Sequence, residues 1–126
     1  MADKQKITEE IMDIIIIGCG KVGTTLAEQL VREDYNVVMI DTSAERMQRV
    51  SDDIDAIKLV GNGASISMQI EAGVQTADML IAVTGSDEMN LLCCLIARKV
   101  GHCHTIARVR NPIYSNELTF IKQQLG

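Results

Sequence analysis

The sequence contains no tryptophan, and its aromatic residues are limited to Tyr35, Tyr114 and Phe120. This excludes a core built around large rings, so packing must rest on aliphatic residues, methionine and alanine. Such residues suit a parallel sheet buried beneath helices. Pro112 is the single proline, so no proline-rich linker divides the chain, and its 126 residues fit one compact domain.

Long apolar runs and an excess of positive charge are also missing. No uninterrupted apolar stretch approaches the roughly 20 residues of a membrane-spanning helix, so direct insertion into a membrane is not expected. The chain carries 12 Lys+Arg against 17 Asp+Glu, a formal net charge of −5. Binding to nucleic acid is not expected either, because neutralising phosphates requires a basic face. With 47% hydrophobic residues, the chain can nevertheless bury a core.

Cysteine is present, but without the spacing of a disulfide framework or a metal site. Residues 1–12 form a charged, polar tail that lacks the apolar segment of a secretory signal. Cys19, Cys93, Cys94 and Cys103 are therefore predicted to be free thiols in a reducing cytoplasm. No C-x-x-C or H-x-x-x-H pair occurs, so we expect no metal, and no Cys/His or Ser/His/Asp set indicates nucleophilic catalysis.

Beyond the tail, short β-branched runs alternate with amphipathic segments of helical length. The predicted strands are 13–17, 36–40, 56–60, 78–83 and 105–109. The predicted helices are 21–33, a helix capped by Thr42 or Ser43 that runs to about residue 51, 64–72, 86–100 and 113–124. This alternation predicts an α/β, doubly wound, Rossmann-like parallel sheet of five strands with helices on both faces, over residues 13–126. Lys58 marks the third strand as an edge strand.

The strongest local motif is GCGKVG at residues 18–23, which follows an apolar strand and opens a helix. Asp41 ends the next strand, 18 residues after Gly23. This G-x-G-x-x-G pattern with a distant acid is typical of dinucleotide binding. Gly18 permits the tight turn, Gly20 lets the backbone approach a pyrophosphate, and Gly23 lets helix and strand pack closely. The alternative is an ordinary glycine turn with a solvated carboxylate.

The charged residues around the motif narrow the choice of ligand. Asp41 favours a free ribose 2′-OH, because a carboxylate repels a 2′-phosphate. We therefore expect NAD(H) or ATP/ADP rather than NADP(H). Lys21 is placed to reach a phosphate, although it could be a solvated lysine in the first helical turn, which the helix dipole slightly disfavours. Arg46 and Arg49 of the following helix are predicted to lie on its solvent side.

A second group of polar residues follows the fourth predicted strand, at residues 84–87. The carboxyl end of a strand beside the first strand is where open α/β sheets bind ligands. Alternatively, Ser86 or Asp87 simply caps the next helix. Arg108 and Arg110 share one face of the fifth strand. They could neutralise a phosphate or the carboxylate of a neighbouring subunit, or form exposed salt bridges.

Four segments together resemble a known family. They are IIIIGCGKVGTTLAEQLVREDYNVVMID, the GNG turn at 61–63, AGVQTADMLIAVTGSDEMNLLCCLIAR and IARVRNPIY. In this order they resemble the TrkA N-terminal domain, the NAD-binding, RCK-type module that regulates potassium transport. The resemblance runs from about Asp13 to the C-terminus.

The resemblance implies a regulatory module and not an enzyme. Such a module binds NAD(H), ATP or ADP and assembles as a dimer or ring on the cytoplasmic face of a membrane-embedded potassium transporter or channel. The implied phosphate contacts are Gly18, Gly20, Lys21, Val22 and Gly23, and the implied ribose contact is Asp41. Asn62, Gly63, Thr84 and Gly85 would line the adenine and nicotinamide side, with Arg108 near the subunit contact. Cys19, Thr42 and Arg46 complete the set of candidate cofactor-binding residues.

The chain departs from the family pattern, and two other functions compete with the regulatory one. The family usually has Gly-Asp where this chain has Gly-Asn at 61–62, and members continue beyond the position of Gly126 into a sixth strand and a C-terminal lobe. An NAD-dependent oxidoreductase fragment would need a proton-transfer residue, but His102 and His104 are expected at the end of the sheet opposite the cleft. An assembly module with a decayed nucleotide site is disfavoured by the intact glycine motif and Asp41.

Overall fold

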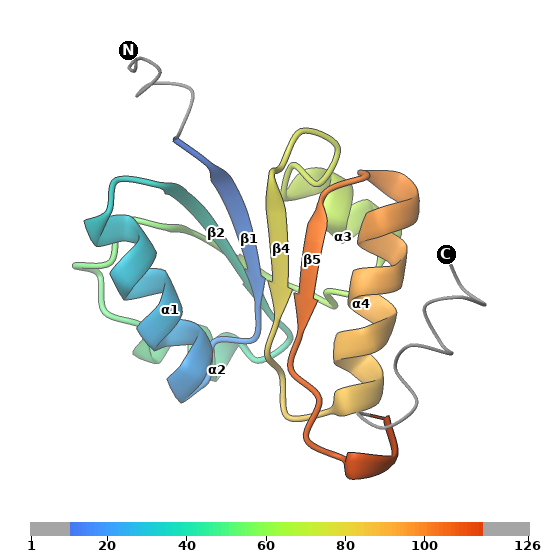
Figure 1. The fold of residues 1–126 in the computed structure, drawn as a ribbon. Coiled ribbons are helices and arrows are strands. Elements are labelled where there is room, and N and C mark those ends of the chain that lie inside the picture. Colours follow the sequence, from blue (N-terminus) through green and yellow to red (C-terminus); the bar gives the residue numbers. More distant parts are fainter. Residues whose placement is uncertain (1–10, 115–126) are drawn as a thin grey trace.

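The computed structural model describes residues 11–114, which form a five-stranded parallel sheet with helices between the strands (Figure 1). The strands are β1 (Asp13–Ile17), β2 (Asn36–Asp41), β3 (Ile57–Val60), β4 (Met79–Ala82) and β5 (His104–Ala107). The helices are α1 (Lys21–Arg32), α2 (Ala44–Arg49), α3 (Ile66–Glu71) and α4 (Asp87–Val100). The strand order is β3-β2-β1-β4-β5. The predicted doubly wound α/β sheet is confirmed.

The direction of winding reverses at the centre of this sheet. From β1 the chain proceeds outward through β2 to β3, and β4 then returns to the opposite side of β1. In the register, Ile17 of β1 lies between Ile40 of β2 and Ala82 of β4. The carboxyl ends of β1 and β4 therefore lie side by side, and the connections that follow them diverge to opposite faces. In open α/β sheets this point is where ligands bind.

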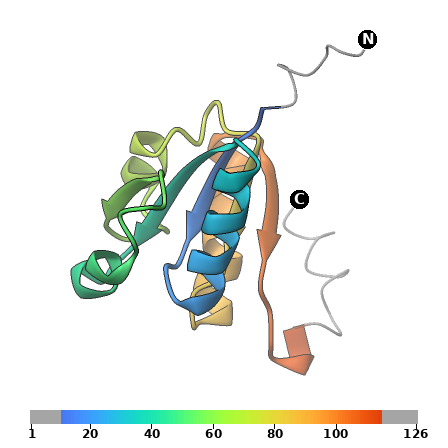
Figure 2. The same ribbon diagram turned by 90° about the vertical axis from the view of Figure 1, so that its left-hand side faces the viewer.

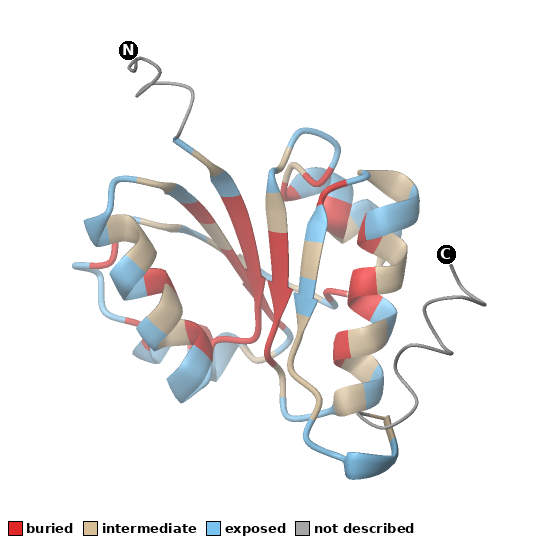
Figure 3. Ribbon diagram, viewed as in Figure 1, coloured by how far each residue is buried: buried red, intermediate tan, exposed pale blue. Residues whose placement is uncertain are grey.

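Helices cover both faces of the sheet (Figure 2). Alternate residues of β1 point to opposite sides, so Ile14 and Ile16 pack with α1 and α2, whereas Ile15 and Ile17 pack with α3 and α4. All four isoleucines are at most 2% exposed. Figure 3 shows the buried residues concentrated in the central strands and on the inward sides of α1 and α4. This double burial explains why β1 is apolar at every position but its first.

Serine side chains begin three of the four helices. Ser43, Ser65 and Ser86 accept hydrogen bonds from the backbone N–H three residues later, at 3.0, 3.3 and 3.1 Å. Ser86, rather than Asp87, is thus the cap of α4. Helix α1 differs, because its N-cap is Gly20 and no side chain caps it. The first N–H groups of α1 are therefore left for another partner.

The five predicted strands and the first four predicted helices match the observed elements to within two residues at each boundary. Strand β3, which carries Lys58, lies at the sheet edge as expected. The predicted polar tail at 1–12 lies outside the described residues up to residue 10. The predicted last helix, 113–124, also lies mostly outside them, although residues 112–114 are helical.

The cysteines and the membrane prediction can also be compared with the fold. All four cysteines are free and buried, which confirms the predicted thiols. Burial raises the pKa of the Cys93 thiol to about 11 and that of Cys94 to about 12, so both stay protonated near neutral pH. Within residues 11–114, no helix combines the length and the apolar character needed to cross a membrane.

Candidate functional site

A cleft of about 560 Å³ opens at the carboxyl ends of β1, β2 and β4, where the winding of the sheet reverses. Its walls come from the turns that follow these strands, from the start of α1 and from the end of β5. The lining residues are Ile17, Gly18, Gly20, Lys21, Val22, Asp41, Thr42, Arg46, Gly61, Asn62, Gly63, Val83, Thr84, Gly85, Ser86, Met89 and Arg108. The cleft thus unites turns that lie far apart in the sequence.

The three glycines of the G-x-G-x-x-G motif occupy distinct environments. Gly18 has φ = +107°, a conformation that side-chain-bearing residues rarely adopt. A Cβ on Gly23 would overlap the carbonyl oxygen of Gly18, so the turn and α1 could not pack as closely. A Cβ on Gly20 would meet nothing within 4 Å, because this backbone faces the open cleft. The steric roles predicted for Gly18 and Gly23 are confirmed, and Gly20 leaves room for close approach.

The start of α1 supplies the polar groups at the floor of the cleft. Lys21 and Val22 in its first turn line the cleft, and no acidic side chain occupies that turn. The uncapped N–H groups and the helix dipole make this position favourable for an anion. Thr24 stabilises the turn, because its hydroxyl donates to the carbonyl oxygen of Cys19 at 3.0 Å.

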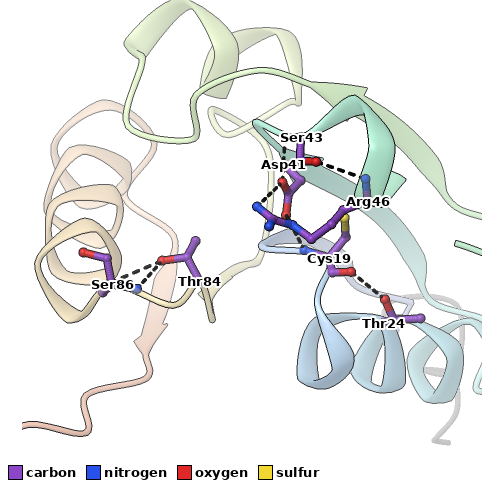
Figure 4. A network of polar contacts seen from close by, with 7 residues as sticks. All are labelled: Cys19, Thr24, Asp41, Ser43, Arg46, Thr84 and Ser86. Atoms are coloured by element: carbon purple, nitrogen blue, oxygen red, sulfur yellow. Dashed lines mark hydrogen bonds and ion pairs between the residues drawn. The ribbon is translucent and has the colours of Figure 1, made fainter. Parts of the chain in front are cut away.

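Asp41 is the most constrained charged group of the site, with only 6% of its surface exposed. Its Oδ2 accepts the backbone N–H of Cys19 at 2.8 Å, and its Oδ1 accepts that of Ser43 at 2.8 Å. The Arg46 guanidinium adds a bond from Nη2 to Oδ1 at 3.0 Å and one from Nε to Oδ2 at 3.4 Å (Figure 4). The carboxylate therefore joins the glycine turn to the start of α2.

These contacts also set the protonation of the site. Burial alone would raise the pKa of Asp41, but the N–H groups of Cys19 and Ser43 and the Arg46 side chain outweigh it and hold that pKa below its usual value. Conversely, burial and then the neighbouring Asp41 carboxylate raise the pKa of the Cys19 thiol to about 11. Asp41 is thus charged and Cys19 neutral near pH 7.

Arg46 and Arg49 were both predicted on the solvent side of α2. Both are exposed, as expected. Arg49 pairs with Glu45, one turn earlier, at 3.3 Å. Arg46 in addition lines the cleft, where its guanidinium pairs with Asp41 at 3.0 Å. A helical pattern gives the direction of the Cβ atom, but the long arginine side chain follows the buried carboxylate.

The opposite wall of the cleft, after β4, is built on Asn90. This side chain is fully buried, and its Oδ1 accepts both the N–H and the hydroxyl of Thr84, at 2.8 and 2.7 Å. Its Nδ2 donates to the carbonyl oxygens of Thr84 and Arg108, at 3.2 and 2.9 Å. All hydrogen-bonding positions of the amide are used. Asn90 thereby ties the β4 turn to the end of β5.

The side chains of Arg108 and Arg110 stabilise the same wall by donating hydrogen bonds to backbone carbonyl oxygens. Nη2 of Arg108 donates to the carbonyl oxygens of Val83 and Thr84, at 3.0 and 2.8 Å. Nη2 of Arg110 donates to that of Gly85 at 3.0 Å. Nε of Arg108 is buried and has no partner within residues 11–114. Both arginines therefore donate to carbonyl oxygens after the end of β4, although they lie beyond β5, which ends at Ala107, so strand alternation does not place them.

The turn after β3 forms the third side of the cleft. The Asn62 side chain accepts the N–H of Ala64 at 2.8 Å, an Asx turn that an aspartate could also form. A Cβ on Gly63 would lie 2.5 Å from Ile17, so this turn packs directly on the end of β1. The Gly-Asn pair that departs from the family pattern thus keeps the local turn.

The structure brings nearly all of the predicted site residues together. Those that line the cleft are Gly18, Gly20, Lys21, Val22, Asp41, Thr42, Arg46, Asn62, Gly63, Thr84, Gly85 and Arg108. Cys19 and Gly23 do not line it: Cys19 contributes its backbone N–H to Asp41, and Gly23 provides close packing.

Five further residues line the cleft: Ile17, Gly61, Val83, Ser86 and Met89. Ser86 belongs to the polar group at 84–87 that was expected where ligands bind, and Gly61 to the turn at 61–63. Sequence reasoning missed Met89 and the last residues of two predicted strands, Ile17 and Val83. Asn90 carried a weaker signal, a polar residue on the inward face of an otherwise apolar helix.

The cleft is cationic although the whole chain is acidic. In the described part of the chain, its lining carries Lys21, Arg46 and Arg108 against the one carboxylate of Asp41, while the formal net charge is −5. This arrangement suits an anionic ligand. Within residues 11–114, no group of three or more His, Cys, Asp or Glu side chains could hold a metal ion. His104 begins β5, at the end of the sheet opposite the cleft.

The fold and the cleft together define a Rossmann-type domain whose cleft lies at the winding reversal, where open α/β sheets bind ligands. The family model for the TrkA-N domain matches residues 14–123. The chain belongs to the TrkA-N domain family.

Individual relatives agree with this assignment. The chain is 41% identical over 115 residues to a Trk system potassium uptake protein TrkA homolog of Archaeoglobus fulgidus, a match covering 91% of this chain and 26% of the relative. The crystal structure of the TrkA-N domain of the inner membrane protein ybaL from Escherichia coli is 25% identical, with a TM-score of 0.75, covering 90% of this chain and 83% of that one.

The GsuK channel bound to NAD shares the fold, with a TM-score of 0.75 and 21% identity, over 86% of this chain and 20% of that one. The match to the Archaeoglobus relative covers 26% of that protein, so this chain spans about a quarter of its length.

Proposed function

We propose that this chain is the nucleotide-binding regulatory domain of a potassium uptake system or channel, on the cytoplasmic side of the membrane. Its ligand is NAD(H), ATP or ADP, and it catalyses no reaction. Family membership supports a role in potassium transport. GsuK, which shares the fold, has solved structures bound to NAD and bound to ADP.

The observation that carries the proposal is the space above Gly20 beside the uncapped start of α1. A substituent at Gly20 would point into the cleft and meet nothing within 4 Å. Backbone N–H groups at a helix start hold phosphates well when no side chain blocks them. Pyrophosphate in this position would lie against the α1 N-terminus, with the Lys21 ammonium group near its charge.

The remaining groups of the cleft fit the other parts of a nucleotide. Asp41 would receive the ribose hydroxyls at the end of β2. The base would lie between the turn at Asn62 and Gly63 and the wall at Thr84 and Gly85. For these residues the assignment rests on their place in the lining of the cleft.

Regulation requires that the nucleotide bind one conformation of the assembly better than another. We infer that the domain works as a homodimer or larger ring attached to the membrane-embedded transporter subunit. The oxidoreductase alternative is disfavoured because His104, at the start of β5, lies at the far end of the sheet from the cleft.

Isothermal calorimetry of the chain with NADH, NAD, ATP and ADP tests the proposal, with NADPH as a comparison. We expect micromolar binding of at least one of the first four ligands. In Gly20→Val, affinity should fall at least tenfold, because two methyl groups enter the phosphate position. Circular dichroism should stay unchanged, since the new side chain points into open space.

The matched control for this experiment is Arg49→Met, which removes an exposed charge outside the cleft. Its affinity should equal that of the wild type. The proposal is wrong if none of the four nucleotides binds, or if Gly20→Val binds as tightly as the wild type.

A further inference from the structure

The Asp41 carboxylate has no acceptor position left in this structure. Two carboxylate oxygens offer about four lone-pair positions. The backbone N–H groups of Cys19 and Ser43 take one on each oxygen, at 2.8 Å. Nη2 and Nε of Arg46 take the other two, at 3.0 and 3.4 Å. A ribose hydroxyl that donates to Asp41 must therefore replace one of these four donors.

Only one of these partners is free to leave. The N–H of Cys19 belongs to the glycine turn, and that of Ser43 to the residue that caps α2. Moving either would disturb the fold. The Arg46 side chain is 51% exposed, against 5% for the Asp41 side chain. Water can therefore replace the carboxylate as partner of the guanidinium at little cost.

We propose that Arg46 is an internal competitor for the ribose hydroxyls and so sets the discrimination at the 2′ position of the adenosine ribose. The inference rests on the proposed function, because it concerns the same nucleotide site. Until a nucleotide binds, Arg46 occupies the face of Asp41 that the ribose needs. A ligand with a free 2′-OH must displace this guanidinium to reach the carboxylate.

A ligand with a 2′-phosphate would be bound by Arg46 instead of competing with it. The guanidinium carries five N–H donors, of which two point at Asp41. The others remain for a phosphate, and guanidinium–phosphate bonds are strong and often bidentate. Arg46 therefore opposes the ligand with a free 2′-OH and assists the ligand with a 2′-phosphate. Both effects reduce the selectivity that Asp41 would supply alone.

The ratio of two affinities in one protein isolates this effect. We would titrate NADH and NADPH by fluorescence, and ADP and 2′-phospho-ADP by calorimetry, into wild type, Arg46→Met and Arg49→Met. Within each pair the ligands differ only by the 2′-phosphate, so attraction to the 5′-phosphates cancels. In Arg46→Met the preference for the free 2′-OH should rise about tenfold, the usual scale of one charge-assisted bond. Arg49→Met should keep the wild-type ratio.

Arg46→Lys provides a second variant in case the methionine loosens the cleft. It keeps the positive charge beside Asp41 but loses the planar fork of donors. Its ratio should fall between those of wild type and Arg46→Met, and its melting temperature should match that of the wild type.

The outcomes separate this inference from the proposed function. If both ligand pairs bind but the ratio is unchanged in Arg46→Met, the competitor role is wrong and the nucleotide site stands. A fall in the ratio would show that Arg46 binds the free ribose directly, and it also overturns the inference. If no nucleotide binds to the wild type, the proposed function fails and the inference fails with it.

Discussion

The two walls of the cleft are held by different kinds of bond. On the β2 side, a carboxylate and a half-exposed guanidinium form an ion pair, Asp41 with Arg46. On the β4 side, the fully buried amide of Asn90 makes four hydrogen bonds to Thr84 and Arg108 without any formal charge of its own. Figure 4 shows Asp41 and Arg46 across the cleft from Thr84.

This difference indicates which wall can respond to a ligand. Opening the Asn90 network would leave the Thr84 N–H and the Arg108 carbonyl oxygen without the partners that Asn90 provides, at about 1–3 kcal/mol each. Opening the Asp41–Arg46 pair costs little on the arginine side, because water solvates the freed guanidinium. We therefore expect the β4 wall to stay fixed, while the β2 wall exchanges partners when a nucleotide binds.

The largest effect should come from breaking the fixed wall with Asn90→Asp. The carboxyl group has nearly the shape of the amide, but it brings an acceptor to the carbonyl oxygens of Thr84 and Arg108, at 3.2 and 2.9 Å. Loss of these two bonds should lower the free energy of unfolding by about 3 kcal/mol in urea denaturation.

Asn62→Asp is the control for this change of one atom. The Asn62 side chain only accepts from the N–H of Ala64, which an aspartate also does. Its effect should stay within about 0.5 kcal/mol. Equal losses in the two variants would refute the special role of Asn90.

The next largest effect is expected in the glycine turn between β1 and α1. Gly23→Ala forces a Cβ against the carbonyl oxygen of Gly18, an overlap with backbone that cannot rotate away. Because the overlap is with backbone, we take the upper end of the cost of overpacking, about 3 kcal/mol, against about 1 kcal/mol gained in helix propensity. We expect a net loss of about 2 kcal/mol by thermal denaturation.

Gly20→Ala adds the same methyl group to the same turn, in open space and with φ = −73°. Its stability should change by less than about 1 kcal/mol. If Gly20→Ala destabilises the chain as much as Gly23→Ala, the packing account of this turn is wrong.

The smallest effect concerns the Asp41–Arg46 pair, and acid titration of Asp41 measures it. The Asp41 pKa is lowered in the fold, so its stabilising contribution is complete above the ordinary value near 3.9 and is lost as the pH falls through the lower folded value. The NMR shift of the Cys19 amide proton, bonded to Asp41 at 2.8 Å, should report this midpoint.

Arg46→Met should move that midpoint upward, because it removes one of the groups that lower the Asp41 pKa. In Asp41→Asn the Cys19 amide should no longer titrate. A midpoint that stays unchanged in Arg46→Met would show that the guanidinium contributes nothing to the carboxylate in solution.

Comparing the predictions with the fold shows where sequence reasoning succeeds. The buried isoleucines of β1, the glycine motif and Asp41 were identified because short-range chemistry determines their roles: apolar runs, backbone conformations and the spacing of one βαβ unit. Cys19 and Gly23, also predicted as site residues, do not line the cleft but support its glycine turn through a backbone hydrogen bond and through close packing.

Two features could not be read from the linear pattern. The pairing of Arg46 with Asp41 depends on where a long side chain finds a buried charge, not on the helical period. Asn90 reads as a polar interruption in an apolar helix until β5 supplies the carbonyl oxygen of Arg108, 18 residues away, as its partner.

The amino-acid pattern alone was sufficient for the class of fold, the order of its elements and the turn that bears the glycines, because each depends on neighbours a few residues apart. The ion pair of one wall and the Asn90 hydrogen bonds of the other depend on the tertiary structure. They form where α2 approaches Asp41 and where α4 meets the segment after β5. A buried polar group is determined by every group around it, and these come from distant parts of the chain.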